Sequence, residues 1–197
     1  TTELSRSFTA TLNDFDRGRS FWDLLCYYSA PIDRQVLEHV GPKLLAHAEV
    51  GDLLGVKRAL DEVSELAAHF AGWRPARWLG LCHYRWLQGD LSGAFEAIEQ
   101  ALLLTKPGEH PYYCKVAGAR IGLLGELGDL AQAVAYGREA LALSEGHRLQ
   151  TGDRWVKEAL ALVLARSGEH LEALAMLDHT IADAERQSQG GLSLGSL

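Results

Sequence analysis

The residue types best suited to chemistry in this chain are its eight histidines and three cysteines. A metal site would show HExxH or a paired Cys and His spacing, and a cysteine nucleophile would need a base beside it. The histidines give neither spacing, and Cys26, Cys82 and Cys114 form no CxxC pair. His83 follows Cys82, but neighbours on a helix point in different directions. We therefore expect no metal, no cofactor and no catalytic residue, and we interpret Cys82 as a small buried thiol.

Four acidic residues recur about 40 residues apart and could be mistaken for a catalytic carboxylate array: Asp52, Asp90, Asp129 and Glu169. Each follows a glycine directly and stands at the start of a helical pattern of apolar residues. A carboxylate at that place accepts hydrogen bonds from the free N–H groups of the first turn and complements the helix dipole. We predict that all four cap helices and that none takes part in catalysis.

The glycines before these acids mark an internal repeat. Gly51, Gly89, Gly128 and Gly168 are separated by 38 (89 − 51), 39 (128 − 89) and 40 (168 − 128) residues. A period of this size, filled only by helical patterns, indicates a stack of helical hairpins. Each glycine would end the first helix of its hairpin. The predicted fold is all-α, a right-handed α-solenoid of about four antiparallel hairpins with an additional N-terminal helix.

The chain divides into three predicted parts. An aromatic helical segment at 1–32 precedes the hairpins, which span 33–187, and a flexible tail rich in Gly and Ser occupies 188–197. The segment at 1–32 either caps the first hairpin or lies in the groove of the array, and both interpretations stay open. The repeats are placed at about 33–71, 73–106, 111–146 and 151–187.

The second hairpin carries a motif beyond its period. Its residues at the relevant spacing are Trp78, Leu81, Cys82 and Arg85, then Ala94 and Ile98, then Pro107. They resemble the tetratricopeptide pattern W-x2-L-G-x2-Y, A-x3-F and P, with Cys82 in place of the glycine and Arg85 in place of the tyrosine. Longer repeats of this kind resemble those of kinesin light chains and of the sensor arms of bacterial signalling and transcription regulators. The resemblance implies a module that binds other proteins.

A binding site would lie on the concave side, where the first helices of stacked hairpins form ladders of equally placed residues. Three of these residues, Gly118, Gly122 and Gly125, share one helical face, at a cost of about 1 kcal/mol each relative to alanine. They indicate either close packing against a neighbouring helix or a trough for a partner. The candidate partner-binding residues are Leu79, His83, Trp86, Lys115, Gly118, Gly122, Gly125, Glu126, Trp155, Glu158 and Arg166.

The charges of the chain restrict the class of partner that it can bind. The net charge of −7 and the scattered Lys and Arg residues argue against direct binding of nucleic acid. The acids among the candidate residues favour an amphipathic or basic helix in the groove. We predict a non-catalytic scaffold module that binds a helix or extended peptide, within a larger signalling or regulatory protein. The alternative is an effector- or peptide-sensing domain of a transcription regulator or of a signalling ATPase or kinase.

The remaining features concern the compartment and the end of the array. An odd number of cysteines and an apolar run at 159–165, far shorter than the roughly 20 residues that span a bilayer, predict a cytoplasmic protein without membrane contact. In the last hairpin, Leu171, Leu174 and Met176 add apolar surface to the stripe of Ala173 and Leu177. One neighbouring helix could not cover all of it. We expect a homodimer contact through the C-terminal helix or a continuation of the array.

Overall fold

A computed structural model describes residues 34–108, 110–146 and 153–193, and every element in these ranges is a helix. The all-α prediction is therefore confirmed for this part of the chain. The expected helix within 1–32 lies outside the described residues. Within the ranges described, no helix has both the length and the apolar character needed to cross a membrane.

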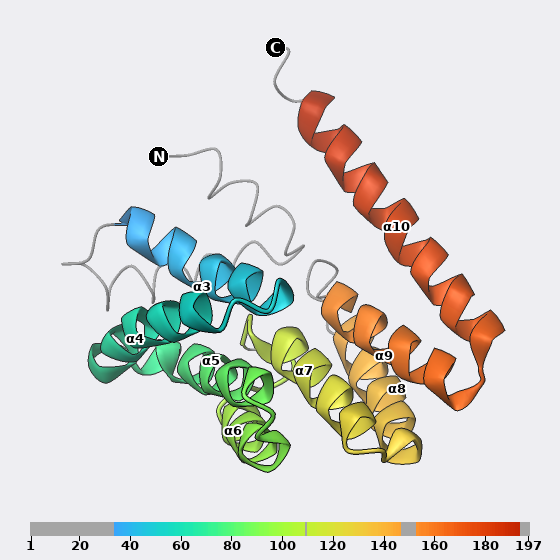
Figure 1. Ribbon diagram of the computed structural model, residues 1–197. Coiled ribbons are helices and arrows are strands. Elements are labelled where there is room, and N and C mark those ends of the chain that lie inside the picture. The colour runs from blue at the N-terminus through green and yellow to red at the C-terminus, as the bar shows by residue number, and fades with distance from the viewer. Residues whose placement is uncertain (1–33, 109, 147–152, 194–197) are drawn as a thin grey trace.

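The helices follow one another through the molecule, and α10 forms its outer edge (Figure 1). α10 continues to Ser193, past residue 187 where the array was expected to end. Four elements, α3, α5, α7 and α9, each precede a turn glycine and are called the first helices below. The elements are α3 (Arg34–Glu49), α4 (Leu53–His69), the 3-10 helix η1 (Ala71–Trp73), α5 (Arg74–Leu87), α6 (Leu91–Leu103), α7 (Tyr113–Glu126), α8 (Leu130–Gly146), α9 (Asp153–Ser167) and α10 (His170–Ser193).

The turns after the first helices are built alike. Their glycines have φ of 72°, 80°, 88° and 93°, a region that a residue with a Cβ rarely adopts. At Gly89, the glycine N–H donates to the carbonyl of Trp86 at 2.9 Å, and the next N–H, that of Asp90, donates to Arg85 at 3.0 Å. The other turns repeat this pair of hydrogen bonds. It is the Schellman motif, which satisfies the last carbonyls of a helix.

Three of the four acids after these glycines cap helices, and the fourth does not. Asp52, Asp90 and Asp129 accept hydrogen bonds from the backbone N–H three residues further on, at 2.9, 2.9 and 3.1 Å. The capping prediction is confirmed for these three and is wrong for Glu169. The longer Glu169 side chain instead accepts a hydrogen bond from Arg138 of α8 at 2.8 Å. This residue therefore connects two helices rather than closing the end of one.

The core consists of two clusters of buried side chains. The first lies mainly between α3 and α6 and includes Leu79 and Ile98, and the second, mainly from α7 to α10, includes Leu160. Phe95 and Leu102 of α6 pack against both clusters. The two clusters are therefore joined through α6.

Candidate functional site

A cavity of about 500 Å³ opens across all four first helices. Its floor and walls are largely apolar, and charged side chains lie at its rim. Most of the residues predicted from the sequence line it, although they are distant from one another in the chain. Those that line it are His83, Trp86, Lys115, Gly118, Gly122, Glu126, Trp155, Glu158 and Arg166.

Two predicted residues do not line the cavity. Leu79 is only 1% exposed and belongs to the first core cluster. Counting back from the turn assumes that every first helix presents the same face to the groove, whereas on α5 this position lies among the buried residues of the first core cluster. Gly125 is also buried, and a Cβ there would lie 2.9 Å from Cγ1 of Val163 on α9. Both predictions of direct partner contact are therefore corrected.

The glycine face of α7 is occupied by neighbouring groups. A Cβ on Gly118 would lie 2.6 Å from the backbone oxygen of Trp155, so the absence of a side chain allows α7 and α9 to approach closely. A Cβ on Gly122 would lie 2.7 Å from Cη2 of Trp86. The close-packing interpretation is right for Gly118 and Gly125. Gly118 and Gly122 also line the cavity, between His83 and Trp86 of α5 and Trp155 and Arg166 of α9, and the Trp86 ring lies against Gly122.

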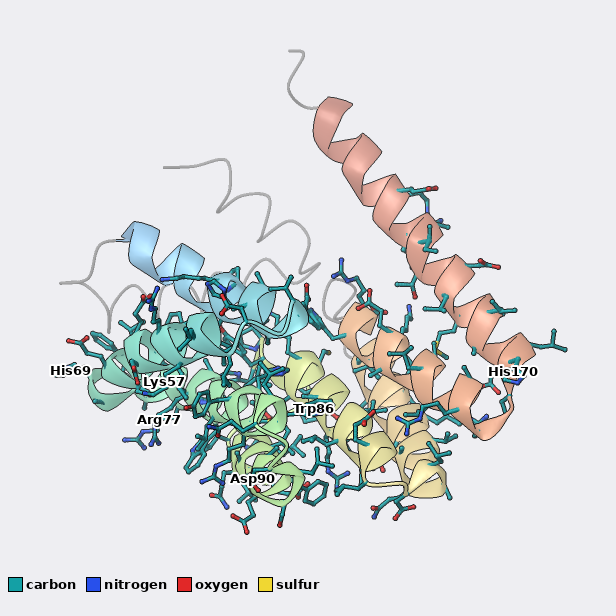
Figure 2. All side chains as sticks on the ribbon, in the orientation of Figure 1. Lys57, His69, Arg77, Trp86, Asp90 and His170 are labelled. Carbon is teal, nitrogen blue, oxygen red and sulfur yellow. The ribbon has the colours of Figure 1, made fainter. Side chains whose placement is uncertain are left out.

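Trp86 and His83 form one wall of the cavity. Figure 2 shows Trp86 where α5 and α7 meet. Its ring lies parallel to that of His83, with centroids 6.2 Å apart and 2° between the planes. Burial lowers the pKa of His83 to about 4, so the imidazole is neutral at neutral pH. This wall therefore presents uncharged, flat aromatic surface to the cavity.

The opposite wall combines an aromatic ring with cations. The Lys115 ammonium lies 4.9 Å from the ring centroid of Tyr112 and 6.0 Å from that of Trp155. The Arg154 guanidinium, which does not line the cavity, lies 5.6 Å from the ring centroid of Trp155. Such distances permit cation–π attraction. Burial lowers the pKa of Lys115, because a desolvated ammonium is less stable than the neutral amine.

The carboxylates at the rim are mostly paired. Arg166 binds Glu126 at 2.8 Å, and Arg154 binds Glu158 at 3.1 Å. Glu49, the third carboxylate of the lining, has no ion-pair partner among the residues that the structure describes. Two of the three carboxylates of the lining are therefore paired with arginines, while the lining as a whole, with Lys115 and Arg166 against three glutamates, keeps a formal net charge of −1 (2 − 3).

Several lining residues were not among those predicted. They are Leu45, Ala48, Glu49, Leu87, Ala119, Ala159, Leu162 and Val163. Ala48 lies three residues before its turn glycine, and Leu45 and Leu162 lie six before theirs, which are the ladder positions of Trp86 and His83. The ladder positions therefore included these three residues, but apolar residues at such positions are also typical of a hydrophobic core. Leu162 is 65% exposed, so it belongs to the mouth of the cavity instead.

Groups that could perform chemistry are placed elsewhere. Cys82 is fully buried, and burial raises the pKa of its thiol to about 12, so it stays protonated. Its interpretation as a buried thiol is confirmed. No cluster of three or more His, Cys, Asp or Glu side chains in the described ranges is arranged to hold a metal ion.

The described residues thus define an all-helical protein with an apolar groove across its first helices. Comparison of the chain with protein-family models and with curated proteins finds no match.

Proposed function

We propose that this chain is a non-catalytic interaction module that binds a helix or an extended segment of another protein in the groove. The observation that carries the proposal is the cavity, whose walls hold Trp86 and Trp155 on different helices. Large aromatic side chains in desolvated pockets supply much of the binding energy at protein interfaces. Leu87 and Leu162 at the mouth are 38% and 65% exposed, so apolar surface continues outward for a partner larger than the cavity.

The fold proposed for this module is a right-handed, tetratricopeptide-like α-solenoid. Its support is the repetition of the same turn after each first helix and the packing of each helix on the next in the chain. The first helices α7 and α9 also pack on each other, as do α3 and α5. By analogy with repeat arrays of this type, we place the module within a larger signalling or regulatory protein.

A second candidate is a domain that senses a small effector or a short peptide. The cavity volume of about 500 Å³ favours it, since pockets for small ligands usually enclose about 300–1,000 Å³. The two candidate functions differ in which residues the bound ligand would cover. A small effector would leave Leu162 exposed, whereas a helix or extended segment would bury it.

The test is a selection of peptides from a displayed random library on the full chain, followed by calorimetric titration of the selected peptides. Trp86→Ala should weaken their binding by about tenfold or more. Trp78→Ala is the matched control, because Trp78 is on the same helix and does not line the cavity. Circular dichroism establishes that both variants remain folded. Peptides that bind the Trp86→Ala variant as well as the native chain would overturn the groove as their site.

A further inference from the structure

Lys115 differs from Arg166, the other cation that lines the cavity. It lines the cavity from the first turn of α7 and is only partly exposed. Its ammonium lies 4.9 Å from the ring centroid of Tyr112 and 6.0 Å from that of Trp155. The rings attract the cation but do not neutralise it.

The arginines near the cavity already have anionic partners. Arg166 is paired with Glu126 and Arg154 with Glu158. Lys115 has no carboxylate within ion-pair distance among the described residues. A cation held partly out of water without an anion is costly, and an incoming anion would recover part of that cost. The groove is therefore prepared to receive a negative charge beside Lys115.

We infer that Lys115 is the position at which the groove receives a carboxylate, so that the docking segment carries an acidic side chain flanked by apolar residues. The inference rests on the proposed function and specifies the chemistry of its partner. It replaces the expected amphipathic or basic helix with a segment that carries an acid, because two of the three carboxylates of the lining, Glu126 and Glu158, already have arginine partners. The apolar flanks of the ligand would contact Trp86 and Trp155, on either side of the charge.

Three small ligands that share one apolar group and differ in charge measure the effect of charge on binding. We would titrate 4-phenylbutyrate, 4-phenylbutanamide and 4-phenylbutylamine into the full chain and follow the indole N–H signals of Trp86 and Trp155 by NMR. The acid should bind about tenfold more tightly than the amide, as a hydrogen bond to a charged group implies, and the amine should bind most weakly.

Three variants assign that preference to one residue. Lys115→Met should make the acid and the amide bind equally, and Lys115→Arg should retain the preference for the acid. Lys57→Met is the control, since Lys57 lies on α4, pairs with Asp61 and does not line the cavity. Equal binding of acid and amide to the native chain, or a preference that survives Lys115→Met, would overturn the inference.

Two N-acetylated peptides distinguish the source of the carboxylate. One is acetyl-Phe-Glu-Phe-amide, whose only carboxylate is a side chain, and the other is acetyl-Phe-Gln-Phe, whose only carboxylate is the chain terminus. Tighter binding of the first supports an internal acidic side chain, and tighter binding of the second overturns that source in favour of a chain terminus. If all probes shift the indole signals equally, the groove remains a binding site and only the role of Lys115 fails. If none shifts them, the inference fails, while the peptide selection still tests the proposed function separately.

Discussion

The helix α7 meets its two neighbouring first helices in different ways. It packs directly against α9, where Gly118 faces the backbone oxygen of Trp155 and Gly125 faces Val163. Towards α5 it faces a side chain instead, because the end of the Trp86 ring lies over Gly122. The same residue type therefore serves two purposes on one helix.

The difference concerns how the two contacts are built beneath the cavity. Two helices that approach until their backbones touch leave no space for a ligand. A tryptophan between two helices holds them further apart and exposes one flank of its ring. The cavity lies over Gly118 and Gly122 of α7, between Trp86 on α5 and Trp155 on α9. We expect the α7–α9 contact to determine stability and the α5–α7 contact to determine binding, and the following predictions test that separation.

The largest effect is expected for Gly118→Ala. Helix propensity alone would stabilise this variant by about 1 kcal/mol. Its Cβ would lie 2.6 Å from a backbone oxygen of α9, which can move only with the helix that carries it. We expect a net loss of about 2 kcal/mol in the free energy of unfolding, as in other overpacked interiors. Urea titration measures it, and a variant as stable as the native chain would contradict direct backbone packing.

The next effect concerns pH and His83, which stacks on Trp86. Its folded pKa of about 4 lies below the value near 6.5 of an unfolded chain, so the unfolded state binds more protons between these values. Stability should therefore be complete above about pH 6.5 and fall as the pH decreases towards 4. Because His83 is partly exposed, we expect its share of the loss to be only about 1 kcal/mol.

The variant His83→Gln isolates this contribution. His110 also has a pKa lowered to about 4 by burial, so the native chain loses stability in the same range for two reasons. Urea titrations at pH 7 and pH 4.5 should show a smaller difference for His83→Gln than for the native chain. An unchanged difference would mean that the His83 ring is hydrated when the protein is folded.

A smaller effect is expected for Gly122→Ala, the counterpart of the first substitution. Its Cβ would meet the end of the Trp86 side chain, which can turn aside without moving a backbone. The gain of about 1 kcal/mol in helix propensity should nearly offset the displacement. We expect the unfolding free energy to change by less than about 0.5 kcal/mol, while the fluorescence of Trp86 shifts. A loss as large as that of Gly118→Ala would remove the distinction between the two contacts.

The repeating parts of this structure could be predicted from the sequence. Glycine adopts the left-handed conformation at the end of a helix without a steric penalty. The period of Gly89 and its equivalents therefore predicts the hairpins directly. The caps at Asp52, Asp90 and Asp129 follow from the same local rule. These features depend on residues within one turn of the chain, which the sequence places side by side.

The candidate site could be predicted only in part, because it depends on how helices rotate and approach. Ladder counting located Trp86 and His83 correctly but placed Leu79 in the groove, since the orientation of α5 depends on the packing of α4 and α6. The pairing of the charges in the groove could not be predicted either. Whether Glu126 is free or paired depends on Arg166, which is 40 residues away in the chain and adjacent only after folding.

The smallest effect on stability is expected for Glu126→Gln, which removes the ion pair between α7 and α9. Both side chains of the Glu126–Arg166 pair are 47% exposed, and pairs of this kind contribute about 0–1 kcal/mol. Binding should respond more strongly than stability, because the substitution leaves Arg166 as a second uncompensated cation at the cavity. The affinity for 4-phenylbutyrate should then rise about twofold to threefold at low salt, with little change for the amide. If the acid bound no better, the field at the rim would be screened by solvent, and selectivity for anions would depend on Lys115 alone.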